Sequence, residues 1–473
     1  MDLTSNEPFW LVKNGLLYFY PSLKEDCKTK ILIVGGGITG ALMAHQCMED
    51  GYETILIDRR EIANGSTSAT TSMLQYEIDL PLYKLTDIIG KEAAEAIYWA
   101  GHDAIDELKT IVMQIQSDCG FEKKESLYYA YSKKDIPNLK KEFKAREASG
   151  LNVKWLSKKE IQLKYGLHHA YAGILSSQGA SIDAFRFTHD LLQYNIKRGL
   201  KVYDKTNITK TNYKSKKVVL TTHYDNKIQA EKVIYCNGYE STEMIKENFV
   251  KLLSTYVIIG EANDKENNRL ENTLFWNTAK PYHYMRTTAD HRLLIGGEDV
   301  DFVNPSKRDQ LIAKKSKKLK QKIEKAFPAY SFRSDFALAN RKLMMERVKD
   351  AFSEVKPEVE FSHFINKPHN FADIEEHFGE EYIVHRKGAT RARKGEWGMI
   401  PGSQGTSSFL VLGKGDPHSF QSCSHGAGRV LSRTQARKQL NLKEEIASLK
   451  EQGILHAIRH RSNLDEAPKQ HIY

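Results

Sequence analysis

The chain has 473 residues, of which 40% are hydrophobic and 27% are charged, and its formal net charge is +10. This composition is typical of a globular protein of up to about three domains, and it excludes wholesale disorder and collagen-like repeats. The excess of basic over acidic residues is small for this length, so composition alone does not indicate a nucleic-acid-binding protein. No apolar run approaches the roughly 20 residues of a membrane helix, so we expect no membrane span.

The cysteines and the first residues predict a cytoplasmic protein. The five cysteines show no CxxC spacing, and an odd number in a long chain favours reduced thiols over a disulfide framework. Residues 1–28 lack the charged and then apolar pattern of a signal peptide.

The first clear elements form a strand–turn–helix–strand unit. Lys30–Val34 is an apolar run typical of a strand that is buried on both faces. A helical pattern over Ala41–Asp50 follows, and Glu53–Ile57 is a second apolar run. This order predicts a Rossmann-type βαβ unit.

The turn between the first strand and the helix carries the motif G-x-G-x-x-G. Gly35 permits the tight turn, Gly37 lets the backbone approach a pyrophosphate, and Gly40 lets helix and strand pack closely. Asp58 ends the second strand, where a carboxylate can accept hydrogen bonds from ribose hydroxyls. The alternative is a glycine-rich turn with an exposed aspartate, but the full context favours a dinucleotide site.

Four features in chain order resemble the D-amino-acid oxidase/glycine oxidase (DAO) family of FAD-dependent oxidoreductases. They are the glycine turn, the small-residue loop with Ser66 and Thr67, the strand ending in Cys236-Asn237-Gly238, and Tyr282–Arg286 before Ile295-Gly296-Gly297. The resemblance covers about residues 1–336. It implies FAD as the cofactor, held in part by Ser66 and Thr67, and oxidation of a C–N bond in a small amine or amino acid by hydride transfer to the flavin.

The same resemblance suggests two substrate contacts. Tyr284 and Arg286 are candidate contacts for a carboxylate, because a guanidinium fork suits a bidentate anion. The alternative is a strand with an outward-facing arginine. The strand and glycine-rich turn that close over the flavin ring in this family have no counterpart in the sequence, so we expect loosely held flavin and little amino-acid turnover.

A lysine-rich run, Lys314–Lys325, has Leu319, Ile323 and Phe327 at four-residue spacing. It predicts an amphipathic helix whose lysines form the solvated face.

The last third of the chain is rich in Gly, Ser, His and Arg. His425 lies between small residues, and Gly426 and Gly428 can expose backbone N–H groups to phosphate. Arg429 and Arg433 are four residues apart and could bind further phosphates from one helix face. An accessible imidazole among such groups suits nucleophilic attack on phosphorus.

The motifs HRKGATRA, IPGSQGT and SHGAGRVLSR closely resemble the RtcB family of RNA ligases, over about residues 338–470. The resemblance implies that His425 accepts GMP from GTP, that His369 is a Mn²⁺ ligand, and that the RNA ends joined are a 3′-phosphate and a 5′-hydroxyl. The implied guanylate contacts are His369, Asn370, Pro401, Gly402, Ser403, Gln404, Ser408, His425, Gly426, Ala427 and Gly428. Arg429 and Arg433 are candidate contacts for the RNA substrate. The family's other metal ligands and its terminal lysine have no counterpart here.

We therefore expect an α/β chain with two parts. Residues 1–336 are a Rossmann-type FAD-binding domain with an α+β substrate domain, and residues 338–473 are a partial RtcB-like α+β segment. Two alternatives remain at this point, a flavin oxidoreductase only and a catalytically incomplete chimaera.

Overall fold

The computed structural model describes most of the chain. The described residues are 2–5, 8–245, 247, 250–260, 269–327, 336–361, 365–367, 370–402, 406–426 and 433–454. The chain divides into two compact units, Met1–Phe336 and Ala337–Tyr473, and each is described by itself.

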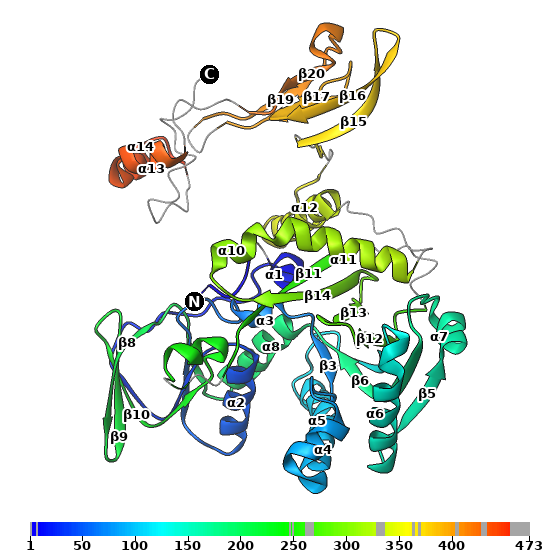
Figure 1. Ribbon diagram of the computed structural model, residues 1–473. Helices are drawn as coiled ribbons and strands as arrows, with labels where there is room; N and C mark the ends of the chain where they lie inside the picture. Colours follow the sequence, from blue (N-terminus) through cyan, green and yellow to red (C-terminus); the bar gives the residue numbers. More distant parts are fainter. Residues whose placement is uncertain are drawn as a thin grey trace. The chain divides into compact units, whose positions relative to one another are not determined.

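A six-stranded sheet forms one half of the first unit, in the order β7-β2-β1-β10-β9-β8 (Figure 1). The first four strands in that order are parallel, and β9 and β8 add in antiparallel fashion. Its strands are β1 (Cys27–Val34), β2 (Thr54–Ile57), β7 (Lys201–Tyr203), β8 (Ile208–Lys214), β9 (Lys217–Thr222) and β10 (Lys227–Tyr235).

The predicted βαβ unit is confirmed. β1 and β2 pair in parallel, and α2 (Ile38–Glu49) connects them. The helix begins three residues earlier than the sequence pattern indicated, directly after Gly37. Helix α8 (Ala184–Ile196) packs beside α2, and their small and apolar side chains share one core cluster with β1 and β2.

A second sheet of eight strands forms the other half of the first unit, in the order β11-β14-β13-β12-β4-β6-β3, with β5 also pairing with β6. Its strands are β3 (Met73–Gln75), β4 (Glu122–Tyr129), β5 (Val153–Ser157), β6 (Ala172–Ser181), β11 (Leu253–Gly260), β12 (Thr273–Asn277), β13 (His283–Thr287) and β14 (Leu293–Asp301). The helices of this unit besides α2 and α8 are α1 (Phe9–Asn14), α3 (Ser66–Ala69), α4 (Leu82–Ile89), α5 (Lys91–Gln114), α6 (Ile136–Ala148), α7 (Lys158–Tyr165), α10 (Pro305–Gln310) and α11 (Ile312–Ala326).

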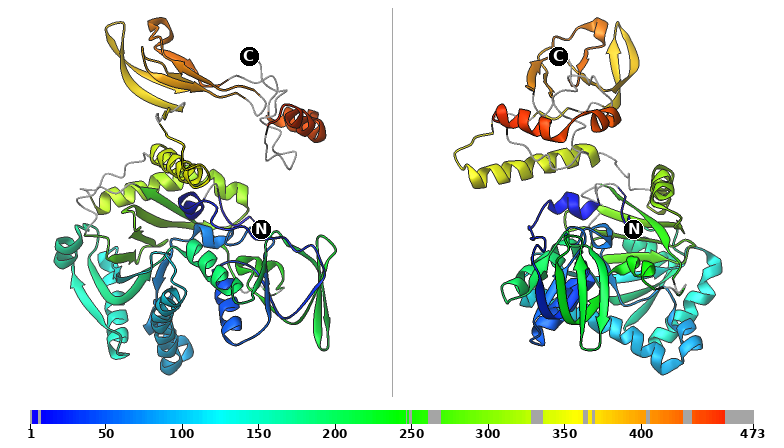
Figure 2. Two further views of the ribbon diagram at one scale, coloured as in Figure 1. Left: turned by 180° about the vertical axis from the view of Figure 1, so that it is seen from behind. Right: turned by 90° about the vertical axis from the view of Figure 1, so that its left-hand side faces the viewer.

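Helix α11 confirms the predicted amphipathic helix. It crosses β11 and β14 (Figures 1 and 2), and Leu319 and Ile323 are buried against this sheet. One lysine departs from the expected solvated face, because Lys315 is buried and donates to the carbonyl of Glu298 at 2.7 Å.

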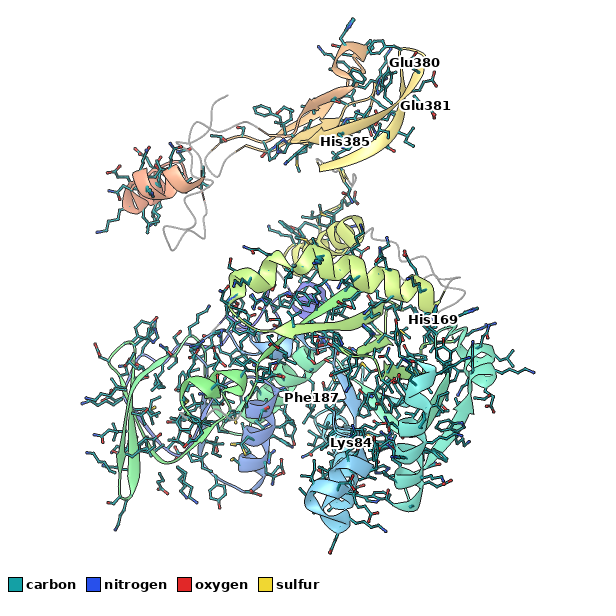
Figure 3. All side chains as sticks on the ribbon, in the orientation of Figure 1. Lys84, His169, Phe187, Glu380, Glu381 and His385 are labelled. Atoms are coloured by element: carbon teal, nitrogen blue, oxygen red, sulfur yellow. The ribbon has the colours of Figure 1, made fainter. Side chains whose placement is uncertain are left out.

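The second unit consists of short two-stranded pieces and helices. The hairpin β15–β16 (Asn370–His377 and Glu380–Lys387) has Glu380 and Glu381 at its turn and His385 further along β16 (Figure 3). The remaining elements are β17 (Ala389–Arg391) paired with β20 (Ser422–Ser424), β18 (Trp397–Ile400) paired with β19 (Phe409–Leu412), and the helices α12 (Phe336–Val355), α13 (Arg433–Gln439) and α14 (Leu442–Glu451). Among the described residues of the whole chain, no helix has the length and apolar character needed to cross a membrane.

Candidate functional sites

The glycine turn after β1 lies so close to neighbouring backbone atoms that it leaves no room for side chains at Gly35 and Gly40. Gly35 has φ +116°, and a Cβ placed there would lie 2.4 Å from the carbonyl oxygen of Cys236 at the end of β10. A Cβ on Gly40 would lie 1.8 Å from the carbonyl oxygen of Gly35. Strand β10 and helix α2 therefore both approach the turn at backbone distance, as the sequence pattern predicted for a dinucleotide-binding turn.

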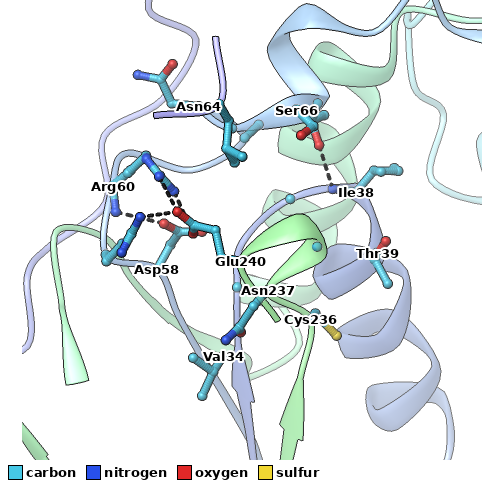
Figure 4. Close-up of a pocket in the computed structure, with 18 of the residues that line it drawn as sticks. Val34, Ile38, Thr39, Asp58, Arg60, Asn64, Ser66, Cys236, Asn237 and Glu240 are labelled. Carbon is cyan, nitrogen blue, oxygen red and sulfur yellow. Dashed lines mark hydrogen bonds and ion pairs between the residues drawn. The ribbon is translucent and has the colours of Figure 1, made fainter. Parts of the chain in front are cut away.

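The small-residue loop packs against the start of α2. The backbone N–H of Ile38 donates to Oγ1 of Thr67 at 3.1 Å, and a Cβ on Gly37 would lie 3.1 Å from the same oxygen (Figure 4). The loop thus reaches the N-terminal end of the helix, where backbone N–H groups and the helix dipole favour an anion.

Asp58 at the end of β2 is held by two backbone groups. Its Oδ2 accepts the N–H of Gly36 at 2.6 Å, and its Oδ1 accepts the N–H of Arg60 at 2.7 Å. Burial raises the pKa of Asp58, and these two hydrogen bonds act in the opposite direction. Each carboxylate oxygen has a second lone pair, so the side chain can still accept from a ligand.

These residues surround one cavity of about 700 Å³, a volume in the range of small-molecule sites. Five of the six sequence-predicted cofactor residues line it, namely Gly35, Gly37, Asp58, Ser66 and Thr67. Gly40 does not line the cavity; because it has no side chain, α2 can pack closely against the glycine turn. The backbone N–H groups at the start of α2 and the lack of side chains at the glycine turn fit the phosphate-bearing part of a dinucleotide.

Sequence reasoning missed an ion-pair cluster at the Asp58 side of the cavity. Glu240 accepts hydrogen bonds from Arg60, with Oε1 2.6 Å from Nη2 and Oε2 3.1 Å from Nη1, and it also pairs with Arg59 (Figure 4). This contact joins the residues after β2 to the residues after β10. The signal in the sequence was only an acidic residue shortly after the Cys236-Asn237-Gly238 turn.

A second cavity of about 530 Å³ adjoins the first, because Leu3, Ser66 and Thr70 line both. Tyr284 lies on its wall, and the hydroxyl of Tyr284 is 3.1 Å from that of Thr255.

Arg286 lies elsewhere, although it is only two residues from Tyr284. It is buried under the ring of Trp10, with Cζ 5.4 Å from the ring centroid, and Nη2 donates to the carbonyl of Ile182 at 3.2 Å. Burial lowers the pKa of Arg286 to about 10. Arg286 therefore does not line the second cavity, on whose wall Tyr284 lies.

In the second unit, His425 follows β20 and meets the residue that precedes β17. Its Nδ1 is 2.6 Å from the carbonyl oxygen of Gly388. A carbonyl oxygen can only accept, so Nδ1 carries the proton and Nε2 of the neutral ring carries the lone pair. This tautomer is the one that a nucleophile acting through Nε2 requires.

Four other predicted guanylate contacts lie in the two segments that meet beside His425. Gly426 lies beside Pro401, because a Cβ on Gly426 would be 3.8 Å from the Pro401 carbonyl oxygen. The N–H of Gly402 donates to Oγ of Ser408 at 3.1 Å. The segments that carry the IPGSQGT and SHGAGRVLSR motifs thus approach each other at this point.

The other predicted residues of this site lie outside the described part of the chain. They are His369, Ser403, Gln404, Ala427, Gly428 and Arg429, together with the side chains of Asn370 and Arg433. Within the described residues, no group of three or more His, Cys, Asp or Glu side chains could hold a metal ion.

A buried ionic cluster contacts β20, the strand that precedes His425. The sequence did not predict this cluster. Arg386 forms a bidentate pair with Glu375, at 2.7 and 2.8 Å, and Oε2 of Glu375 is 3.0 Å from Nε2 of His377. Arg386 also donates to Oγ of Ser422 at 2.9 Å and to the carbonyl of Phe420 at 2.8 Å. The hairpin β15–β16 is thereby fixed to the start of β20.

Comparison with known proteins now identifies the family. The model of the FAD dependent oxidoreductase family (DAO) matches residues 30–352. The chain belongs to this family. The model of the tRNA-splicing ligase RtcB family matches residues 303–471, so an RtcB-like ligase region is fused to the oxidoreductase region. The two matched ranges overlap over residues 303–352.

Individual relatives show the same division. RNA-splicing ligase RtcB of Escherichia coli (strain K12) is 48% identical over 117 residues, which is 24% of this chain and 29% of the ligase. The putative Rieske 2Fe-2S iron-sulfur protein YhfW of Bacillus subtilis (strain 168) is 25% identical over 233 residues, 49% of this chain and 44% of that protein. The chain thus spans less than half of either relative.

A solved structure supports the fold of the DAO region. L-proline dehydrogenase from P. horikoshii superposes with a TM-score of 0.51 at 15% sequence identity, covering 63% of this chain and 78% of that one.

Proposed function

We propose that the DAO region binds FAD in the first cavity and oxidises a C–N bond of a small amine or amino acid in the cytoplasm. The observation that supports this proposal is the joint lining of one cavity by Gly35, Gly37, Asp58, Ser66 and Thr67. FAD, when bound, supplies the acceptor for a hydride.

The protein's own groups would act as follows. Gly35 and Gly37 admit the pyrophosphate to the backbone, and the N-terminal end of α2 provides N–H groups and a positive dipole end. Asp58 accepts from ribose hydroxyls through its remaining lone pairs. Tyr284 bounds the adjoining cavity in which the substrate would lie.

A direct experiment is flavin binding by the full chain. We expect FAD added to the purified chain to bind in about a 1:1 ratio, because a single cavity carries the dinucleotide turn. Titration of the chain into FAD, followed by flavin fluorescence at equilibrium, measures this ratio, since a loosely held flavin would be lost on gel filtration. A folded chain that shows no flavin absorbance and changes no flavin fluorescence would contradict the proposal.

We propose a second activity for the RtcB-like region, supported by the tautomer of His425. Nε2 would attack the α-phosphorus of GTP, forming an N–P bond while pyrophosphate leaves with the electrons of the broken P–O bond. In a ligase with a complete metal site, the GMP would then pass to an RNA 3′-phosphate, and an RNA 5′-hydroxyl would displace it, with Mn²⁺ as the expected ion; for this chain we propose the guanylylation step alone. Because the family's other metal ligands have no counterpart in the sequence, we expect weak guanylylation and no RNA sealing by the isolated chain.

This proposal predicts that His425→Ala abolishes covalent labelling by radiolabelled GTP in the presence of Mn²⁺. The control is His418→Ala, because His418 lies in the same unit but outside the predicted guanylate contacts, and it should keep the label. Label that persists in His425→Ala, no label in the unaltered chain, or efficient sealing of RNA ends would each contradict the proposal.

A further inference from the structure

The residues that line the second cavity indicate which class of substrate the DAO region can bind. It adjoins the first cavity along Leu3, Ser66 and Thr70, so a ligand in it would lie beside the dinucleotide. Apolar side chains and hydroxyl groups dominate its described lining. Among the described residues that line it, only Asp2 and Arg308 are charged.

The outer wall of this cavity is the beginning of the chain. Asp2–Ser5, Pro8 and Phe9 line it, and the following residue, Trp10, is buried. The indole N–H of Trp10 donates to the carbonyl of Thr70 at 2.6 Å, in the stretch that follows the small-residue loop. The segment is therefore fixed to the same part of the fold that lines both cavities.

The guanidinium group of Arg308 donates hydrogen bonds to residues of this segment. Its Nη1 donates to the carbonyl of Asp2 at 2.9 Å, and its Nη2 donates to the carbonyl of Thr4 at 2.9 Å and lies 3.4 Å from Oδ2 of Asp2. Its Nε donates to Oδ1 of Asp309 at 2.8 Å. All three guanidinium nitrogens thus have protein acceptors, and the Nη1–Nη2 edge, which would bind a carboxylate bidentately, already donates to Asp2 and Thr4.

The remaining charges near the cavity are unfavourable to a carboxylate. Arg286, the other candidate contact, is buried under Trp10 and does not line the cavity. Burial, together with the nearby carboxylates of Asp299 and Asp79, raises the pKa of Tyr284 to about 12. Asp299 and Asp79 thus place negative charge near Tyr284, while the one cation among the described lining residues, Arg308, is already paired with the N-terminal segment, and both features disfavour an anionic ligand.

We propose that the second cavity binds amines that lack a carboxylate, and that residues 2–5 exclude amino acids by occupying Arg308. This inference rests on the proposed function, because it takes the cavity as the substrate side of the flavin site. It narrows the substrate class from amines and amino acids to amines alone.

Two probes that differ only in the carboxylate test the proposal. Benzylamine and phenylglycine share the phenyl ring and the amine, and their dissociation constants are measured by calorimetry on the chain with and without FAD. We expect benzylamine to bind at least about tenfold more tightly than phenylglycine. Equal binding, tighter binding of phenylglycine, or no binding of benzylamine would overturn the proposal.

A variant lacking residues 2–5 tests the role of Arg308. We expect its affinity for phenylglycine to rise by about tenfold, because the guanidinium can then meet the carboxylate bidentately. Arg308→Gln in the same shortened chain should remove this gain. A gain that does not depend on Arg308 would overturn the assignment.

The outcomes separate the two proposals. Flavin content and thermal unfolding are measured for every variant, so a misfolded variant is recognised. A chain that binds no flavin contradicts the proposed function, whereas a chain that binds flavin but does not discriminate between the probes contradicts only the substrate inference.

Discussion

Replacing Gly40 by alanine should abolish FAD binding. The added Cβ would lie 1.8 Å from the carbonyl oxygen of Gly35, which is backbone and cannot move aside like a flexible side chain. Either α2 or the turn must shift, and the distance between the glycine turn and the helix N-terminus changes with it. We expect a loss of FAD affinity of about a hundredfold or more, and a loss of stability of about 1–3 kcal/mol from overpacking. Flavin fluorescence titration and thermal unfolding measure the two effects.

Gly51→Ala is the matched control. Gly51 follows the other end of α2, and its Cβ would meet nothing within 4 Å, although its φ of +75° makes the substitution strained. This variant should lose about 1 kcal/mol of stability and keep its FAD affinity. If both variants lost flavin equally, helix stability rather than the close approach would explain the result.

Replacing Glu375 by alanine should destabilise the second unit by about 3–5 kcal/mol, because it leaves the buried guanidinium of Arg386 without its carboxylate partner. Hydrogen exchange of peptides from β15, β16 and β20 measures the loss. Glu381→Ala is the control, because Glu381 lies at the exposed end of the hairpin (Figure 3) and should change stability by about 0.5 kcal/mol or less.

The same carboxylate gives a pH dependence of known sign. The hydrogen bonds from Arg386 lower the pKa of Glu375 to about 2 from the ordinary value of 4.5. The unfolded state therefore binds a proton more readily between these values, and the stability of the second unit falls as the pH falls from 4.5 toward 2. Glu375→Ala should flatten this part of the pH profile. A variant that keeps the wild-type profile and stability would show that the pair contributes nothing.

The sequence predicts those parts of the molecule in which local pattern and tertiary structure agree. β1, α2, β2 and α11 follow from apolar runs, a glycine turn and four-residue spacing. The dinucleotide motif predicts Gly35, Gly37 and Asp58 because it encodes close backbone approach, and the family resemblance predicts Ser66 and Thr67; all five line one cavity. In the second unit, His425 lies beside Gly388 of the HRKGATRA motif, and Gly426 lies beside Pro401 of the IPGSQGT motif.

The features that the sequence did not predict depend on contacts between distant segments. The pairing of Glu240 with Arg60 spans 180 residues of sequence, and no local pattern marks it. In the hairpin β15–β16, Ile374 and Ile383 are directly opposite each other and exposed, whereas Glu375 is buried with Arg386. This reverses the usual alternation of buried apolar and exposed charged residues, since the bidentate pair satisfies the charges internally.

The contact between Asp2 and Arg308 also has a consequence for how the chain folds. It joins groups 306 residues apart, and Arg308 leaves the ribosome long after Asp2 has been made. During synthesis the backbone carbonyls of Asp2 and Thr4 therefore remain without Arg308 until the chain has been made beyond that residue. Arg308 cannot fix the wall that residues 2–5 form at the second cavity before then.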